Sequence, residues 1–301
     1  MRSLFFCLPL FLLACTPDSD GDGLSNKDEE AAGTNPEKRD TDGDGLGDAM
    51  EADFGTDPLV EDTDGDGLLD GDEKDMGTNG TVVDTDSDGY TDYAESLAGT
   101  NPADPASVIY TGGWPFNPDK DSMTVGDPDE RRVIAGTSYV PRFQLVDQFG
   151  ETVDIYDFGH QGKPILIDLS GAWCYWCNEM AKLIERQPST FDDFAGDPNY
   201  PWIESLPDLV ENGDLYWVTI LDANNSSYES PPTERTISTW STTYPNPYIP
   251  VMGDYDWTVR GWIDPDGWPT VMLVDENMLV HTFDKADYSV AIAAAMEMVQ
   301  P

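Results

Sequence analysis

Basic residues are scarce in this chain. Lysine and arginine together number 15 against 59 aspartates and glutamates, so the formal net charge of the 301 residues is −44. Proteins that bind nucleic acid need clustered basic side chains to meet the phosphates, and this composition argues against such a partner. The length allows two domains, with a sizeable core in at least one of them.

Long apolar runs are equally scarce. The run from Leu4 to Ala14, behind Arg2, is too short for an ordinary membrane-spanning helix, and no other stretch is long and apolar enough to cross a bilayer. A short apolar run that follows a basic residue is typical of a secretory signal.

The end of that run, Leu-Leu-Ala-Cys at residues 12–15, resembles the lipobox of bacterial lipoproteins. The resemblance implies that a signal peptide of residues 1–14 is removed and that Cys15 is lipidated. Thr16 rather than aspartate follows the cysteine, which favours the outer membrane of a bacterial cell envelope, on its periplasmic or its exposed side. A plain signal peptide with an incidental cysteine is the alternative.

Cysteine is also rare, with four in the chain. If Cys7 leaves with the signal peptide and Cys15 carries lipid, only Cys174 and Cys177 remain. These two form a single C-x-x-C. One such pair is not a framework of structural disulfides.

The sequence does contain a repeated acidic phrase. Four copies begin 22 residues apart, at Asp18, Asp40, Asp62 and Asp84, and they are DSDGDGLSNKDE, DTDGDGLGDAME, DTDGDGLLDGDE and DTDSDGYTDYAE. Aspartate at positions one, three and five, glycine at six and glutamate at twelve form the ligand pattern of an EF-hand-type calcium loop. A disordered acidic spacer is the alternative, but it gives no reason for the recurring glycine and glutamate.

Only three residues separate each closing glutamate from a Gly-Thr pair such as Gly33-Thr34. That leaves room for about one helical turn, not for the two flanking helices of a true EF-hand. The array, residues 15–104, resembles thrombospondin type 3 repeats. The resemblance implies calcium as the cofactor, with backbone carbonyls from Leu24, Leu46, Leu68 and Tyr90. The implied side-chain ligands are Asp18, Asp20, Asp22, Asn26, Glu29, Asp40, Asp42, Asp44, Asp48, Glu51, Asp62, Asp64, Asp66, Asp70, Glu73, Asp84, Asp86, Asp88, Asp92 and Glu95.

Apolar residues are sparse in these repeats, so hydrophobic burial cannot offset the loss of chain entropy. The carboxylates of one loop also repel one another until a divalent ion arrives. We therefore expect the repeats to be ordered only with calcium and to form a stiff spacer between the membrane and the next domain.

Residues 105–138 are rich in proline, glycine and polar side chains, which fits either a linker or an ordered lead-in. In residues 139–301, predicted strands alternate with predicted helices. This alternation predicts an α/β fold with a mixed sheet flanked by helices. The expected strands are 164–169, 215–221 and 269–275, and the expected helices are 174–184, 233–243 and 286–299.

Three elements in order carry a second resemblance: Asp168 in a strand, the C-x-x-C at the following strand-to-helix turn, and Gly-Trp-Pro-Thr at residues 267–270. They resemble the thioredoxin superfamily, in particular its membrane-tethered TlpA-like members, over residues 139–299. The resemblance implies a thioredoxin-like fold and a thiol–disulfide oxidoreductase.

The resemblance also implies roles for single residues. Cys174 would be the exposed nucleophile, with its thiol pKa lowered by the helix N-terminus, and Cys177 would resolve the mixed disulfide. Asp168 would be the buried proton shuttle, and Pro269 would be a cis proline that shapes the substrate groove.

Trp176 and Trp268 are the expected contacts to the substrate, which would be a protein or a small thiol or disulfide. Tyr-Trp stands between the cysteines where relatives commonly have Gly-Pro or Pro-Pro, so the redox direction stays open. Residues 188–212 look like an insertion that could overhang the site.

Two alternatives remain open from the residues alone. The C-x-x-C could be half of a zinc site, although only His160 and His281 could contribute further ligands. It could also be a structural disulfide in a non-enzymatic calcium-binding protein of the cell surface that serves adhesion or assembly.

Overall fold

The computed structural model describes residues 17–130, 132–224, 230–285 and 288–299. The chain divides between Ser107 and Val108 into two compact units. The predicted signal peptide and the lipidation site Cys15 lie outside the described residues. None of the described helices is long and apolar enough to cross a membrane.

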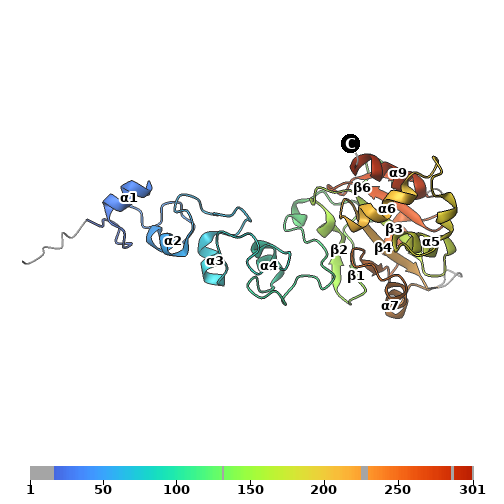
Figure 1. Cartoon of the computed structure of the whole chain (residues 1–301), viewed down its shortest axis with the longest axis horizontal. Helices are drawn as coiled ribbons and strands as arrows, with labels where there is room; N and C mark the ends of the chain where they lie inside the picture. The colour runs from blue at the N-terminus through green and yellow to red at the C-terminus, as the bar shows by residue number, and fades with distance from the viewer. Residues whose placement is uncertain (1–16, 131, 225–229, 286–287, 300–301) are drawn as a thin grey trace, which may run out of the picture. The chain divides into compact units, whose positions relative to one another are not determined.

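The first unit is a series of loops, each followed by a seven-residue helix (Figure 1). Each helix begins at the ninth loop position and ends at a glycine such as Gly33, whose φ of 93° is left-handed. The helices are longer than the single predicted turn because each starts inside the loop and includes the closing glutamate. They are α1 (Asn26–Ala32), α2 (Asp48–Phe54), α3 (Asp70–Met76) and α4 (Asp92–Ala98).

Neighbouring repeats are joined through the fifth loop aspartate. Oδ2 of Asp22 accepts the backbone N–H of Ala49, in the first turn of α2, at 3.1 Å. A carboxylate at that position satisfies an orphan N–H and complements the helix dipole. Each of the first three loops therefore caps the helix of the next repeat. The equivalent bonds join Asp44 to Gly71 and Asp66 to Tyr93, both at 2.9 Å.

The second unit is built on a seven-stranded sheet with the order β2-β1-β5-β4-β3-β6-β7. Strand β4 runs parallel to β3 and β5, whereas β6 is antiparallel to β3 and β7. This confirms the predicted mixed sheet. The strands are β1 (Gln144–Val146), β2 (Thr152–Asp154), β3 (Ile165–Gly171), β4 (Tyr216–Ala223), β5 (Val251–Gly253), β6 (Thr270–Val274) and β7 (Val280–Phe283).

Helices cover the sheet (Figure 1). They are α5 (Tyr175–Ile184), α6 (Trp202–Glu211), α7 (Glu234–Thr243), α8 (Thr258–Ile263) and α9 (Tyr288–Val299), with short 3-10 helices η1 (Lys120–Ser122), η2 (Ile155–Phe158) and η3 (Thr190–Phe194). One apolar cluster joins α5, α6 and α9 to strand residues such as Leu166, Trp217 and Val271. A second cluster joins α7 to the two cysteines, Leu221 and Val251.

The segment before residue 139 is an ordered lead-in, and the second unit begins at Val108. Its anchor is the fully buried carboxylate of Asp157. This group accepts hydrogen bonds from the Tyr110 hydroxyl at 2.7 Å and the Asn117 backbone N–H at 3.1 Å, and it pairs with the Lys120 ammonium at 2.5 Å. These bonds show an ordered lead-in packed on the second unit and not a loose linker, the two possibilities that the composition left open.

Replacement of Asp157 by alanine should therefore destabilise the second unit. The change leaves a buried hydroxyl and an N–H without an acceptor and Lys120 without its counter-charge. We expect a loss of about 3 kcal/mol in the free energy of unfolding. Urea unfolding followed by tryptophan fluorescence reports on this unit alone, because all nine tryptophans lie beyond residue 107. Asp119→Ala, at an exposed position of the same lead-in, is the control, and equal effects of the two changes would contradict the anchor.

Candidate functional site

The disulfide between Cys174 and Cys177 lies at the start of α5. Strand β3 ends at Gly171, whose carbonyl accepts the Cys174 N–H at 2.8 Å and turns the chain into the helix. Cys174 is the N-cap residue, and its Sγ accepts the Cys177 N–H at 3.2 Å. The first cysteine thus occupies the end of the helix where backbone N–H groups and the dipole favour negative charge on sulfur.

The predicted exposure of Cys174 is wrong in this structure. Only 4% of Cys174 and 1% of Cys177 are accessible to solvent. The reason is packing, because both cysteines belong to an apolar cluster against which Trp173 and Trp268 lie. Their rings meet edge to face, 5.7 Å apart. Sequence spacing places the cysteine at a helix start but does not predict what covers it.

Asp168 is buried behind the helix, as predicted, with 3% of its surface accessible. It lines a cavity of about 20 Å³ together with Ala181, one helical turn after Cys177. The Ser170 hydroxyl donates to both carboxylate oxygens at 2.8 and 2.9 Å. Burial raises the pKa of Asp168 to about 7, against the opposing effect of these hydrogen bonds. An acid with this pKa can give or take a proton near neutral pH.

The peptide bond between Trp268 and Pro269 is cis, which confirms the prediction for Pro269. Pro269 itself is buried, while Trp268 is half-buried. The Trp268 indole Nε1–H donates to Oδ1 of Asp222 at 3.0 Å. Sequence reasoning missed Asp222, because its role depends on a contact 46 residues along the chain.

Trp176 is 41% exposed and lies beside the insertion 188–212, with its ring 5.8 Å from that of Phe191. The insertion contains η3 and α6 and is tied to α5 by Glu179. That carboxylate accepts the Thr190 N–H and hydroxyl at 2.6 and 2.8 Å and pairs with Lys182 at 2.6 Å. Burial alone would raise the pKa of Glu179, but these partners outweigh it and lower the pKa to about 2. The insertion therefore borders α5 on its Trp176 side.

Among the described residues, no cluster of zinc ligands surrounds the C-x-x-C. His281 pairs with Asp275 at 3.0 Å on the β6–β7 hairpin. Within the ranges that the structure describes, groups of three or more potential metal-ligating residues occur only in the repeats.

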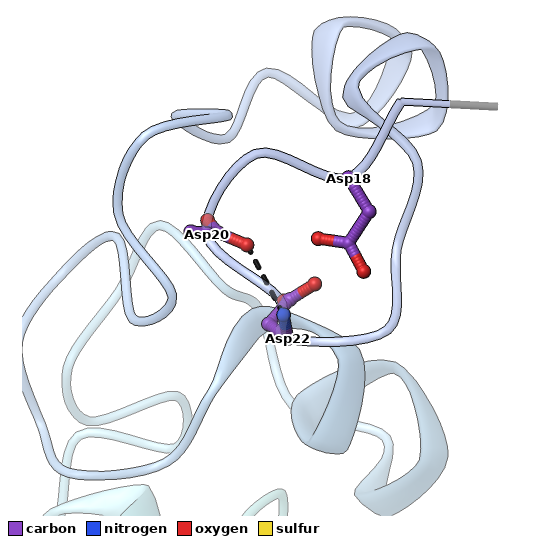
Figure 2. A group of neighbouring side chains, drawn as sticks. All are labelled: Asp18, Asp20 and Asp22. Atoms are coloured by element: carbon purple, nitrogen blue, oxygen red, sulfur yellow. Dashed lines mark hydrogen bonds between the residues drawn. The ribbon is translucent and has the colours of Figure 1, made fainter.

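The first, third and fifth aspartates of each repeat come together, with ligand atoms all within 4.8 Å of one another. Figure 2 shows the first triad, in which the carboxylates of Asp18, Asp20 and Asp22 face the interior of the loop. The other three triads are Asp40, Asp42 and Asp44; Asp62, Asp64 and Asp66; and Asp84, Asp86 and Asp88.

The closing glutamates are fully buried, and the aspartates at positions three and five are their electrostatic neighbours. Burial, followed by the repulsion of these aspartates, raises the pKa of Glu51 and of Glu73 to about 8 and that of Glu95 to about 7. The same causes raise the pKa of Glu29. Such groups need protons or a cation.

Several carboxylate oxygens inside these loops have no hydrogen-bond donor. The first aspartate of a loop is satisfied, because backbone N–H groups of its own loop reach it, as in the 2.7 Å bond from Gly43 to Asp40. The unsatisfied atoms are Oδ2 of Asp20, Asp42, Asp64, Asp86 and Asp88, both Oε atoms of Glu29 and Glu51, and Oε2 of Glu73 and Glu95. Clustered, buried and unsatisfied anionic oxygens are what a hard cation such as calcium requires.

The residue at the ninth position of each loop is bonded to the residue at the second position. Both oxygens of Asp48 accept hydrogen bonds from the N–H and hydroxyl of Thr41, at 2.7 and 2.8 Å, so this aspartate closes its own loop. Asp70, its equivalent in the third repeat, makes the same bonds to Thr63 and also approaches Asp44 and Glu51 of the preceding repeat. The motif alone contains no signal for this contact between repeats. The other ninth-position pairs are Asn26 with Ser19, Asp70 with Thr63 and Asp92 with Thr85.

A protein-family model matches the first unit. The second unit has a thioredoxin-like fold, by the order and direction of β4, β3, β6 and β7 described above. Residues 18–38, 40–61, 62–79 and 84–105 match the bacterial TSP3 repeat family, so the first unit consists of four such repeats. A comparison with curated protein sequences gave no match.

Similar solved structures include three thioredoxin-like proteins. The thioredoxin domain of a thiol-disulfide oxidoreductase from Bacteroides vulgatus is 16% identical, covers 55% of this chain and 99% of its own, and has a TM-score of 0.35. An exposed lipoprotein thioredoxin from Streptococcus pneumoniae is 16% identical, with coverages of 51% and 98% and a TM-score of 0.33. A thioredoxin-like protein from Aeropyrum pernix is 16% identical, with coverages of 52% and 88% and a TM-score of 0.37.

The raised pKa of Asp168 predicts a pH-dependent cost to stability. The unfolded carboxyl ionises near its ordinary pKa of 3.8, whereas the folded one keeps its proton until about pH 7, so stability falls as pH rises between these values. Relative to Asp168→Asn, the oxidised wild type should lose on the order of 4 kcal/mol across this window and change little above it. Urea unfolding of both proteins at several pH values measures the difference. Parallel stability curves would show that Asp168 ionises normally.

Proposed function

We propose that this protein is a thiol–disulfide oxidoreductase that acts outside the cytoplasm, held on a lipid anchor by a calcium-stabilised spacer. The observation that carries the proposal is the C-x-x-C disulfide at the N-terminus of α5, with the buried Asp168 behind it. A structural cross-link over three residues constrains little of the chain, whereas this location is suited to releasing a thiolate.

The exchange would proceed as follows. A substrate thiolate attacks Sγ of Cys174 and breaks the bond to Cys177, which leaves as a thiolate and takes a proton from Asp168. A second substrate thiolate then attacks the mixed disulfide and releases the Cys174 thiolate, which the helix N-terminus stabilises. The substrate loses two electrons and the protein gains them. The reverse sequence oxidises the protein, and the relative potentials decide the direction.

Calcium is the proposed ligand of the repeats. The first, third and fifth aspartates and the closing glutamate of each loop would hold it, because the oxygens of the three aspartates converge and several oxygens of the aspartates and glutamates lack donors. A bound divalent ion supplies the positive charge that these buried carboxylates need. The ninth-position residues would act through hydrogen bonds inside the loop.

The anchor and the location are supported by sequence alone. Cys15 in its lipobox-like context would carry lipid, and the repeats would hold the second unit away from the membrane of the bacterial envelope. The acidity of the repeats suits millimolar calcium outside the cell, where modules of this type bind at about 10⁻⁴ to 10⁻³ M.

The burial of Cys174 favours one alternative, a non-enzymatic calcium-binding surface protein in which the disulfide is structural. With 4% of Cys174 accessible, a substrate can reach the sulfur only if a covering side chain moves. The two functions differ in whether the disulfide exchanges with added thiols while the fold stays intact.

Calcium binding should release protons. At pH 7 the buried Glu51 and Glu73, with pKa values of about 8, are mostly protonated, and Glu95, with a pKa of about 7, is half protonated. Addition of calcium to calcium-free protein whose loops already have this fold should therefore release roughly two protons per chain at pH 7 and far fewer at pH 9.5, whereas loops that fold only with calcium would release few protons at either pH. A pH-stat titration measures this.

Two matched variants test the source of those protons. Glu51→Gln should release about one proton fewer than the wild type, whereas Glu30→Gln, at an exposed position of α1, should behave like the wild type. Calcium addition without proton release, or an equal effect of both variants, would contradict calcium binding by closing glutamates that are already buried in the calcium-free protein.

The cysteine variants separate enzyme from structural protein. Cys174→Ser should abolish the acceleration of insulin reduction by dithiothreitol, because it removes the sulfur that forms the mixed disulfide. Cys177→Ser should trap that intermediate, which non-reducing electrophoresis detects as a slower band. Unchanged urea unfolding of the variants would show that the fold survives. A wild type that does not accelerate the reaction, with variants that lose only stability, would favour the surface protein.

A further inference from the structure

Trp268, which packs against the cluster that contains the disulfide, is itself tied to a second group of residues. Trp268 packs on the cluster that contains Cys174 and Cys177, and its ring lies edge to face on Trp173. Gly171 leaves room for Trp173, since a Cβ there would lie 2.9 Å from Nε1 of that ring. The two rings therefore form one packed pair beside the cluster in which the disulfide is buried.

Asp222 holds three partners at the end of β4. Its side chain is fully buried, and Oδ1 accepts the Trp268 indole N–H at 3.0 Å. Oδ2 lies 3.7 Å from Nη1 of Arg260, and the backbone carbonyl accepts the Trp257 indole N–H at 2.7 Å. One residue thus fixes two indole rings and a guanidinium group.

Arg260 completes the arrangement. Its guanidinium carbon lies 5.3 Å from the ring centroids of both Trp257 and Trp268, within the range of a cation–π contact. Helix α8 presents this side chain, and the buried carboxylate of Asp254 fixes the helix start by accepting the N–H groups of Val259 and Arg260 at 3.2 and 2.8 Å. The contacts that position the Arg260 charge and the Trp257 and Trp268 rings therefore do not involve the disulfide.

We propose that Trp268 is a gate over Cys174, that Asp222 and Arg260 are positioning residues that hold it closed, and that a thiol substrate reaches the sulfur only when this indole swings away. The inference rests on the proposed function and specifies how its substrate gains access. It also explains how a buried disulfide can take part in exchange. A gate changes the rate of reduction and of reoxidation by the same factor, so it leaves the equilibrium with a small dithiol unchanged.

The test uses the oxidised full-length protein and dithiothreitol as the thiol. Asp222→Asn keeps an acceptor for the indole but removes the charge that attracts Arg260. Arg260→Met keeps the apolar stem without the charge, and Trp268→Phe keeps a ring without the tethered N–H. Arg186→Met is the matched control, because it removes an exposed ion pair at the opposite end of α5.

We expect reduction to be about fivefold faster in each of the three gate variants, as for the loss of one hydrogen bond or charge contact, and unchanged in the control. The equilibrium constant with dithiothreitol should stay at the wild-type value. In the Trp268→Phe background, Asp222→Asn should give no further increase, because the gate is already released. This absence of additivity separates a gate from a general loosening of the fold.

Three results would overturn the gate. These are wild-type rates in Asp222→Asn and Arg260→Met, a full Asp222→Asn effect in the Trp268→Phe background, or a shifted equilibrium constant in place of a faster rate. Because Trp268→Phe and Arg260→Met are read independently, poor folding of Asp222→Asn does not block the test. Insulin reduction is a separate readout: a wild type that is inert toward insulin counts against the proposed function, while the dithiothreitol rates still decide the gate.

Discussion

A carboxylate taken out of water needs a proton, a cation or several hydrogen-bond donors, and this requirement organises both units of the protein. In the repeats, the closing glutamates are buried among other acids, and several of their oxygens have no donor. In the second unit, Asp157 anchors the lead-in, Asp168 lines a cavity with residues of α5 and Asp222 holds the Trp268 indole. Each buried acid of the second unit has partners within the chain, whereas the closing glutamates need a proton or an external cation.

The repeats are coupled to one another by the same chemistry. The fifth aspartate of one loop caps the next helix, and the ninth aspartate of the third repeat approaches the closing glutamate of the second. A cation held by one loop would therefore order a carboxylate that also fixes the neighbouring helix. Order in such an array spreads from repeat to repeat, since each unit is too small to bury an apolar core alone.

In the second unit the end of β4 contributes to two groups of side chains. Leu221 belongs to the cysteine cluster, while the next residue, Asp222, lies where the pairing of β4 with β3 shifts register and binds Trp257, Trp268 and Arg260. A shift of this kind re-aims a side chain, so adjacent residues can serve the disulfide cluster and the Trp268 indole. The chemistry of the sulfur and the access to it can be changed separately.

Local pattern was enough to predict much of this protein. The 22-residue period located the acidic loops, and the alternation of buried strands with helices predicted the mixed sheet, because both depend on residue spacing that survives in any tertiary context. Local pattern could not predict contacts between segments that are distant in the sequence. The burial of Cys174, the pairing of Trp268 with Asp222 and the approach of Asp70 to Glu51 depend on which side chains the fold brings together, and only the tertiary structure decided those contacts.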